Sequence, residues 1–135
     1  MVKGNAPSEY RSVGYYEGYQ FKRECLYQDA FQVDGSEYTH LHFGFGDIST
    51  DYGISIEDDM TKYQFNNFKY IDGPKRILSF GGWDFSTKPD TYQILRQGTA
   101  PANRMKLANN IANFIKDNGL DGVDIDWEYP SVSTL

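Results

Sequence analysis

Three carboxylate side chains stand at alternate positions of an otherwise apolar run near the end of the sequence, at Asp124, Asp126 and Glu128. Successive side chains of a β-strand point to opposite faces, so a strand here would carry all three acids on one face. Like charges crowded in a poorly solvated place raise the pKa of at least one of them. A protonated carboxylic acid beside an ionised one can protonate a leaving-group oxygen, such as that of a glycosidic bond. The spacing therefore predicts an active-site strand that performs acid–base chemistry.

Two other interpretations of this run are open: a solvent-exposed acidic strand edge, and a set of oxygen ligands for a divalent cation. Val123, Ile125 and Trp127 would share the opposite face, which implies covering helices and a strand buried on both faces, and this disfavours the exposed edge. The sequence has no phosphate-binding loop of the kind that accompanies many magnesium sites. His40 and His42 have no partner at metal-ligand spacing. We therefore expect no metal and no cofactor.

Composition narrows the class of protein. The 135 residues fit one domain, and 39% hydrophobic with 16% aromatic residues is enough for a packed core. The formal net charge of −6 argues against a nucleic-acid partner, which needs a basic surface. No apolar run reaches the length of a membrane span, and residues 1–8 lack the apolar centre of a signal peptide, so the chain is either cytosolic or has lost a leader. Cys25 is the single cysteine and is expected to be a free thiol.

The elements that must position the acids follow from hydrophobic periodicity and turn residues. A polar leader of residues 1–11 precedes a single unit of residues 12–135. Strands are predicted at 11–16, 39–47, 75–82 and from 121, and helices at 57–68, 90–96 and between a cap at Thr99 and Gly119. A brief extended stretch is expected at 51–56, but no hairpin partner directly after the second strand. Strands separated by helical patterns predict successive parallel β/α units.

Four such units fit either an open doubly wound sheet or part of a β/α barrel. The residues that could do chemistry lie at or near the carboxyl ends of the predicted strands, where both architectures place their sites. The first strand is not followed by a glycine-rich dinucleotide-binding turn, and acids along one strand face suit a barrel interior. We therefore predict an α/β protein with a parallel barrel, in which His40 and His42 are satisfied interior residues and not ligands.

Two motifs then identify a family. The run Asp121-x-x-Asp124-x-Asp126-x-Glu128, preceded by Ser79-Phe-Gly-Gly82, resembles the two signatures of glycoside hydrolase family 18, the chitinases. The strands at 13–16 and 39–45 are similar to the family's first two barrel strands. The resemblance implies a parallel (β/α)8 TIM barrel, which typically needs about 250 residues. This chain would supply about the first four β/α units, with the first and fourth strands as open edges, and would require the remaining C-terminal half of the barrel as its partner.

The resemblance also implies a reaction and roles for the acids. The family hydrolyses β-1,4 linkages between N-acetylglucosamine units of chitin by a retaining mechanism in which the substrate's own N-acetyl carbonyl attacks the anomeric carbon. Glu128 would be the general acid and later the base. Asp126 would orient the acetamido group and stabilise the positive intermediate, and Asp124 would hold Asp126 through a shared proton as one coupled pair.

The remaining candidate residues fall into two groups. The aromatic residues would contact chitin or a chitooligosaccharide, although core packing is an alternative role for them: Tyr15, Phe45, Trp83, Trp127 and Tyr129. The others would have structural roles in the motifs: Ser79, Gly81, Gly82, Asp121 and Gly122.

The resemblance implies that the parent protein is secreted or acts in the cell wall. Two alternatives to an active chitinase are a chitooligosaccharide-binding relative without turnover and an inactive fragment. Relatives of the first kind usually lose the terminal acid of the motif, whereas Glu128 is present here.

Overall fold

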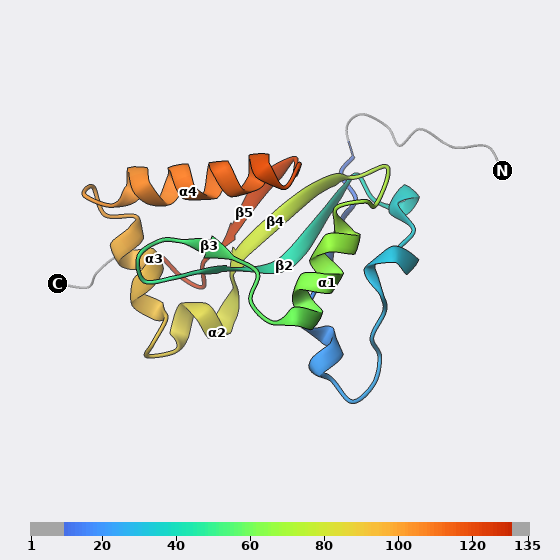
Figure 1. Ribbon diagram of the computed structural model, residues 1–135, viewed down its shortest axis with the longest axis horizontal. Coiled ribbons are helices and arrows are strands. Elements are labelled where there is room, and N and C mark those ends of the chain that lie inside the picture. Colours follow the sequence, from blue (N-terminus) through green and yellow to red (C-terminus); the bar gives the residue numbers. More distant parts are fainter. Residues whose placement is uncertain (1–9, 131–135) are drawn as a thin grey trace.

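The computed structural model describes residues 10–130, which form a parallel sheet with helices (Figure 1). The predicted polar leader, residues 1–11, therefore lies almost wholly outside the described residues. The sheet runs in the order β1-β2-β4-β5, and every neighbouring pair on this path is parallel. Its strands are β1 (Val13–Glu17), β2 (His40–Ile48), β4 (Lys75–Gly81) and β5 (Gly122–Asp126). All four strands were predicted, and the parallel β/α order is confirmed.

The connections differ in kind. A chain of short 3-10 turns joins β1 to β2, namely η1 (Gln20–Lys22), η2 (Ala30–Gln32) and η3 (Gly35–Glu37). Between β2 and β4 lies α1 (Asp59–Phe68), whose first turn is capped by the Asp58 side chain accepting the Thr61 N–H. Between β4 and β5 lie α2 (Gly82–Thr87), α3 (Tyr92–Gly98) and α4 (Arg104–Asp117).

One prediction about pairing was wrong. A two-residue strand, β3 (Ile54–Ser55), turns back and pairs antiparallel with the end of β2, so β2 does have a hairpin partner. The turn is closed by the Ser49 N–H, which donates to the Gly53 carbonyl at 3.0 Å, and by Tyr52 in a left-handed conformation with φ of 69°. The extended stretch expected at 51–56 is this strand, but two residues are too few for periodicity to show a pairing.

The start of the last helix was also misplaced. Thr99 is the C-cap residue of α3, where its Oγ1 donates to the Leu95 carbonyl at 2.8 Å, and α4 begins only after Asn103. A threonine followed by a proline two residues later is typical of a helix start. The threonine hydroxyl can instead donate a hydrogen bond to a carbonyl of the preceding helical turn, and here the Leu95 carbonyl of α3 is that acceptor.

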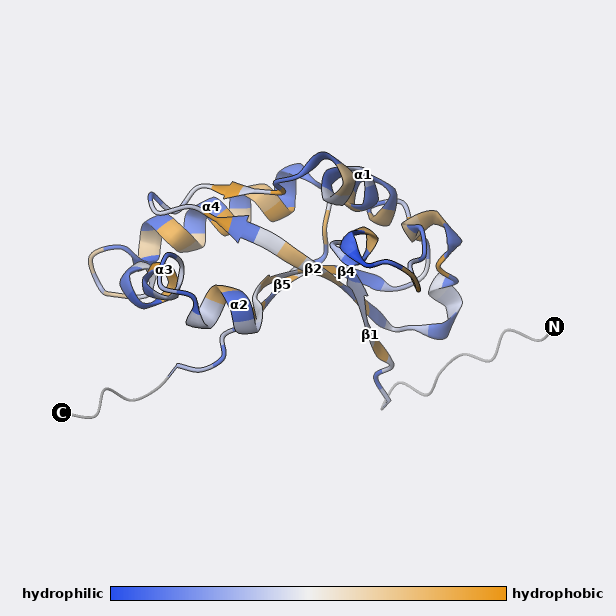
Figure 2. Cartoon of the chain, turned by 90° about the horizontal axis from the view of Figure 1, so that it is seen from below, coloured by the Kyte–Doolittle hydropathy of each residue, from blue (hydrophilic) through white to orange (hydrophobic). Residues whose placement is uncertain are grey.

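The core lies between the sheet and the helices on one of its sides. Figure 2 shows α1 and α4 on the same side of the sheet. Phe43 of β2 contacts Phe65 and Phe68 of α1 edge-on, with ring centroids 5.2 and 5.3 Å apart, and Phe43 and Phe68 are fully buried. Alternation along the strands therefore sends the neighbouring residues, such as His42 and Ser79, toward the other face of the sheet.

β1 and β5 are the outer strands of the sheet, as expected of open edges. Val123 and Ile125 of β5 are each 46% exposed, which contradicts the expectation that this strand is buried on both faces. Together with α4 they line an apolar groove of about 640 Å³. The prediction of covering helices holds only in part, because α4 lies beside β5 but leaves Val123 and Ile125 partly exposed.

Within residues 10–130, no helix has the length and apolar character needed to cross a lipid bilayer. Cys25 is a free and exposed cysteine.

Candidate active site

The sheet register brings together side chains that are far apart in the sequence. Tyr15 of β1 lies opposite His42 of β2, and Ser79 of β4 lies opposite Asp124 of β5. The Tyr15 hydroxyl donates to Asp124 Oδ2 at 3.0 Å, and the Ser79 hydroxyl donates to the same oxygen at 2.8 Å. Asp124 is therefore fixed by residues from two other strands.

His42 joins this cluster, although the sequence did not suggest it as a site residue. Its Nδ1 lies 3.3 Å from Asp124 Oδ2 and 3.4 Å from Ser79 Oγ, and its ring centroid is 4.6 Å from that of Tyr15. The only signal in the sequence was its place on a strand that carries glycines and aromatic residues, which does not tell which residues lie opposite it. The register supplies that information.

Asp126 occupies the next inward position on β5. Its pKa is raised, first by burial and then by the negative charge of Asp124. This agrees with the prediction that crowding raises the pKa of at least one acid, although burial is the larger cause. The pKa of Tyr15 is raised to about 12, by burial first, then by its hydrogen bond to Asp124 and the charges of Asp124 and Asp126. Tyr15 therefore keeps its proton and remains a donor at neutral pH.

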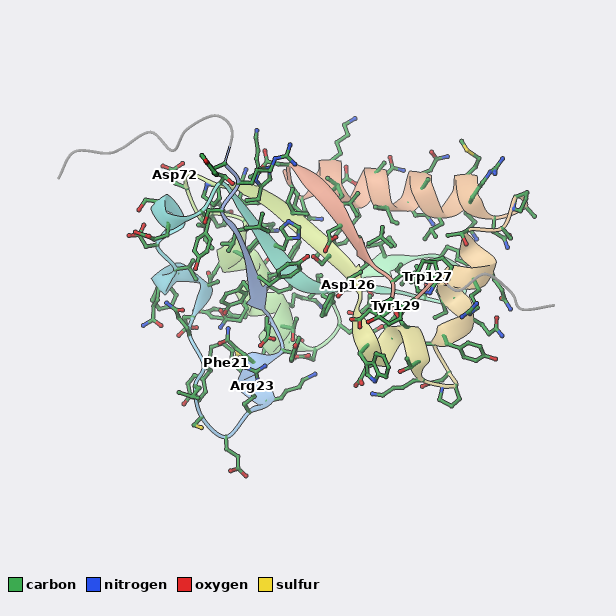
Figure 3. All side chains as sticks on the ribbon, turned by 180° about the vertical axis from the view of Figure 1, so that it is seen from behind. Phe21, Arg23, Asp72, Asp126, Trp127 and Tyr129 are labelled. Atoms are coloured by element: carbon green, nitrogen blue, oxygen red, sulfur yellow. The ribbon has the colours of Figure 1, made fainter. Side chains whose placement is uncertain are left out.

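Glu128 lies just beyond the strand and not on it. β5 ends at Asp126, two residues before Glu128, so the prediction of one strand carrying all three acids was wrong at its end. The Glu128 N–H donates to Ser86 Oγ of α2 at 3.0 Å, and Ser86 is buried. A helix that was not predicted thus positions the segment with the terminal acid. Figure 3 shows Asp126, Trp127 and Tyr129 at the end of β5, close to α2 and α3.

Two glycines allow the strands to approach one another at this end of the sheet. Gly81 lies opposite Asp126 and has a φ of 112°, and a Cβ there would stand 2.1 Å from the Asp126 carbonyl oxygen. Gly82 has a φ of 80°, and its Cβ would stand 3.0 Å from the ring of Phe45. A side chain at either position would be strained in conformation and would collide with a site residue or its backbone.

The first acid of the motif faces a different neighbour. Asp121 Oδ2 accepts the Arg76 N–H at 2.9 Å and lies 3.3 Å from Arg76 Nε, while the Asp121 N–H donates to the Arg76 carbonyl at 2.8 Å. The bond from the Arg76 N–H is the largest cause of the lowered pKa of Asp121. A Cβ on Gly122 would lie 2.9 Å from Ile77 Cδ1. Asp121 and Gly122 therefore join the starts of β4 and β5.

The aromatic candidates occupy two environments. Tyr15, Trp83 and Tyr129 are 55%, 60% and 69% exposed, so their rings are free to contact a ligand. Phe45 is half-buried and stacks on Tyr19, with centroids 6.4 Å apart.

Trp127 differs from the other aromatic candidates. It packs against the hydrophobic core, with the Arg96 guanidinium 5.9 Å from its ring centroid. Its ring is thus already in contact with protein. Trp83 belongs to the first turn of α2, one residue further from the strand than the sequence suggested.

No group of three or more His, Cys, Asp or Glu side chains that could hold a metal ion occurs among residues 10–130.

A family model described as glycosyl hydrolases family 18 matches residues 11–134. Secreted chitinase LysM12 of Penicillium expansum is 76% identical over 135 residues, which are 100% of this chain and 9% of that protein. Probable chitinase LysM18 of the same organism is 52% identical over 138 residues, covering 100% of this chain and 10% of that protein. The chain thus spans about a tenth of the length of these relatives.

The group IV chitinase of Ostrinia furnacalis has a similar structure, with a TM-score of 0.73 and 24% sequence identity, covering 93% of this chain and 35% of that chain. The family match and this shared fold confirm the prediction of an α/β TIM barrel, of which the four parallel strands are the first β/α units.

Proposed function

The chain belongs to glycosyl hydrolases family 18, and from this membership we propose that it forms part of an active site that hydrolyses β-1,4 linkages between N-acetylglucosamine units of chitin. Two Penicillium expansum relatives, Secreted chitinase LysM12 and Probable chitinase LysM18, support this substrate by their names. The chain spans only about a tenth of those proteins. The proposed activity therefore belongs to the complete active site, of which these residues form one part.

The observation that carries the proposal is the arrangement at the carboxyl end of β5. One acid, Asp124, accepts hydrogen bonds from two other strands, and the next, Asp126, has a raised pKa. The third, Glu128, follows where α2 holds the backbone. Carboxyl groups side by side, one of them with a raised pKa, and a further acid beyond them can supply a proton donor and negative charge at one place.

In the mechanism we propose, Glu128 protonates the glycosidic oxygen and the N-acetyl carbonyl oxygen of the substrate attacks the anomeric carbon. The bond to the leaving sugar breaks, and a positively charged oxazolinium ring forms. Asp126 orients the acetamido group and, with Asp124, stabilises that charge. A water molecule then attacks the anomeric carbon, with Glu128 accepting its proton, so the configuration is retained. Glu128 gives up one proton in the first step and recovers one from water in the second, so it ends in its starting state.

The exposed rings of Tyr15, Trp83 and Tyr129 are the proposed contacts for the sugar faces, and Phe45 is proposed to form part of the floor. Trp127 stays a candidate contact, although its ring already packs on the protein. We also propose that further β/α units complete the site across the open edges of the sheet.

We also propose an extracellular place of action, which the name of the relative Secreted chitinase LysM12 supports. Detection of the protein in culture medium with an antibody would test this.

Replacement of the terminal acid tests the proposed reaction. Glu128→Gln in the intact protein should lower the rate of chitooligosaccharide hydrolysis by on the order of 10² to 10⁴, because a carboxamide cannot donate the required proton. The matched control is Glu37→Gln, the same change at an exposed residue of η3, which should leave the rate unchanged. Undiminished turnover in Glu128→Gln would contradict the role. If the unaltered protein bound chitooligosaccharides but released no product, a carbohydrate-binding function would replace catalysis.

A further inference from the structure

The His42 side chain has partners that define which of its atoms carries a proton. Its Nδ1 lies 3.3 Å from Asp124 Oδ2 and 3.4 Å from Ser79 Oγ. The Ser79 hydroxyl hydrogen is already directed at Asp124, at 2.8 Å, so the Ser79 oxygen presents lone pairs to the imidazole. Asp124 Oδ2 already accepts the hydroxyl hydrogens of Tyr15 and Ser79, so it too presents a lone pair to the imidazole. Two acceptors facing one ring nitrogen require that this nitrogen be the donor.

The other contacts of the imidazole hold it in this orientation. The Tyr15 ring lies 4.6 Å from it, tilted by 52°, and the Tyr15 hydroxyl reaches the same oxygen of Asp124. The side chains of His42 and Asp124 are 14% and 25% exposed, so water competes little for either. The titratable groups that face His42 are Tyr15 from β1 and Asp124, with Asp126 one position further, from β5; β4 contributes the Ser79 hydroxyl.

We propose that His42 is a positioning residue for the reaction assigned above: its Nδ1–H donates to Asp124 Oδ2 and holds that carboxylate in place beside Asp126. This inference rests on the proposed function for its catalytic consequence, but the His42–Asp124 contact stands on geometry alone. A hydrogen bond to the charged form of an acid favours that form, so loss of the Nδ1–H should change the pH dependence of the reaction. Neither His42 nor its role follows from the alternating acids of the motif.

The position of the proton is tested directly by nitrogen NMR of the full chain, which contains only two histidines. His42→Asn assigns the two imidazole signals, and His40, whose Nδ1 contacts Thr39 Oγ1 at 2.9 Å, is the internal reference. At neutral pH the chemical shifts of His42 should show a protonated Nδ1. In Asp124→Ala the proton should move toward Nε2. A His42 with its proton on Nε2 in the unaltered protein would overturn the proposal, whether or not the protein is a chitinase.

The catalytic consequence is tested by the pH dependence of kcat/KM for a chitooligosaccharide in the intact protein. His42→Phe keeps a ring beside Tyr15 but removes the donor, and should lower kcat/KM by on the order of 10-fold or more, the usual effect of losing a hydrogen bond to a charged group. The acid limb of the profile, which reports the carboxylate pair as a whole, should move to higher pH. His42→Asn places an amide N–H near the former Nδ1 and should restore most of the rate.

A purely structural role would lower the rate without moving the limb, so a slow His42→Phe variant that kept the acid limb of the unaltered protein would refute the proposal. His40→Asn, the same change two residues earlier on β2, should leave both the rate and the profile unchanged. Absence of hydrolysis in the unaltered protein would instead count against the proposed function, and the NMR result would then decide the His42–Asp124 contact on its own.

Discussion

A single carboxylate oxygen organises the chemistry of this site. Asp124 Oδ2 accepts hydrogen bonds from the hydroxyl groups of Tyr15 and Ser79 and lies 3.3 Å from His42 Nδ1. The pKa of the neighbouring Asp126 is raised, first by burial and then by the charge of Asp124. Two acids separated by one residue thus have different surroundings: Asp124 accepts two hydroxyl hydrogen bonds, whereas Asp126 has a pKa raised by burial and by the charge of Asp124. Such a pair titrates as a unit.

Also at the residue scale, Gly81 is the position where a side chain would do most harm. Gly81→Ala should reduce the free energy of unfolding by about 2 kcal/mol or more, because the alanine would need a φ of 112° and its Cβ would meet the Asp126 carbonyl oxygen at 2.1 Å. Urea denaturation measures the change. Gly119→Ala is the matched control, since Gly119 also has a positive φ, of 64°, but its Cβ would meet nothing within 4 Å. Equal losses in the two variants would contradict the predicted collision.

At the scale of elements, hydrophobic patterning predicted the parallel strands and the helices α1 and α4 because each has one face that must be buried. α2 was missed, since its six residues are too few to show a period, and it begins directly at Gly82. Its Ser86 nevertheless holds the backbone of Glu128. The misplaced Thr99 cap has a similar cause, because a local pattern cannot tell which of two adjacent helices a threonine serves.

The junction between β4 and β5 gives a prediction with a defined pH dependence. Asp121→Ala should reduce the free energy of unfolding by about 1 kcal/mol at neutral pH, because the Arg76 N–H loses its acceptor. The pKa of Asp121 is lowered below its ordinary value of 3.8 in the folded protein, so its stabilisation is present above that value. It is lost as the pH falls through the lower, folded pKa. Urea denaturation at several pH values should therefore show the difference between the two proteins shrinking in acid.

Asp117→Ala, at the last residue of α4, is the control for removal of an exposed aspartate, and it should not reproduce the loss. An acid at a helix C-terminus is not favoured by the helix dipole, so its removal has little to destabilise. A difference between the Asp121 variant and the unaltered protein that persisted unchanged in acid would show that the carboxylate charge is not the cause.

For the whole molecule, the open edges of the sheet are the main feature. Neither β1 nor β5 has a second neighbour in the sheet of the described residues, and β5 presents Val123 and Ile125 beside the apolar groove along α4. An unpaired strand edge with exposed apolar side chains favours pairing with other chains. Asp124 and Asp126 lie on this same strand and Glu128 follows just beyond it, so the open edge adjoins the proposed site.

The purified 135-residue chain should therefore associate in a concentration-dependent manner, measurable by sedimentation velocity. Ile125→Lys should shift it toward the monomer, because a charged side chain in the groove must be desolvated on association. Met105→Lys is the matched control, since Met105 is 66% exposed on α4 and does not line the groove. A chain that is monomeric at all concentrations, or equal effects of the two lysines, would contradict the role of the edge.

The sequence by itself determined the family and the order of parallel strands and helices, and it proposed the three acids of the site, because these depend on residue types and local spacing. Tertiary structure decided which side chains meet Asp124, since Tyr15 is 109 residues away and His42 contacts it only through the register of the sheet. It also decided where the strand stops: Glu128 leaves β5 because its N–H bonds to Ser86 and not to a neighbouring strand. Spacing along a chain specifies which groups share a strand, but distance between strands depends on the packing of the whole sheet.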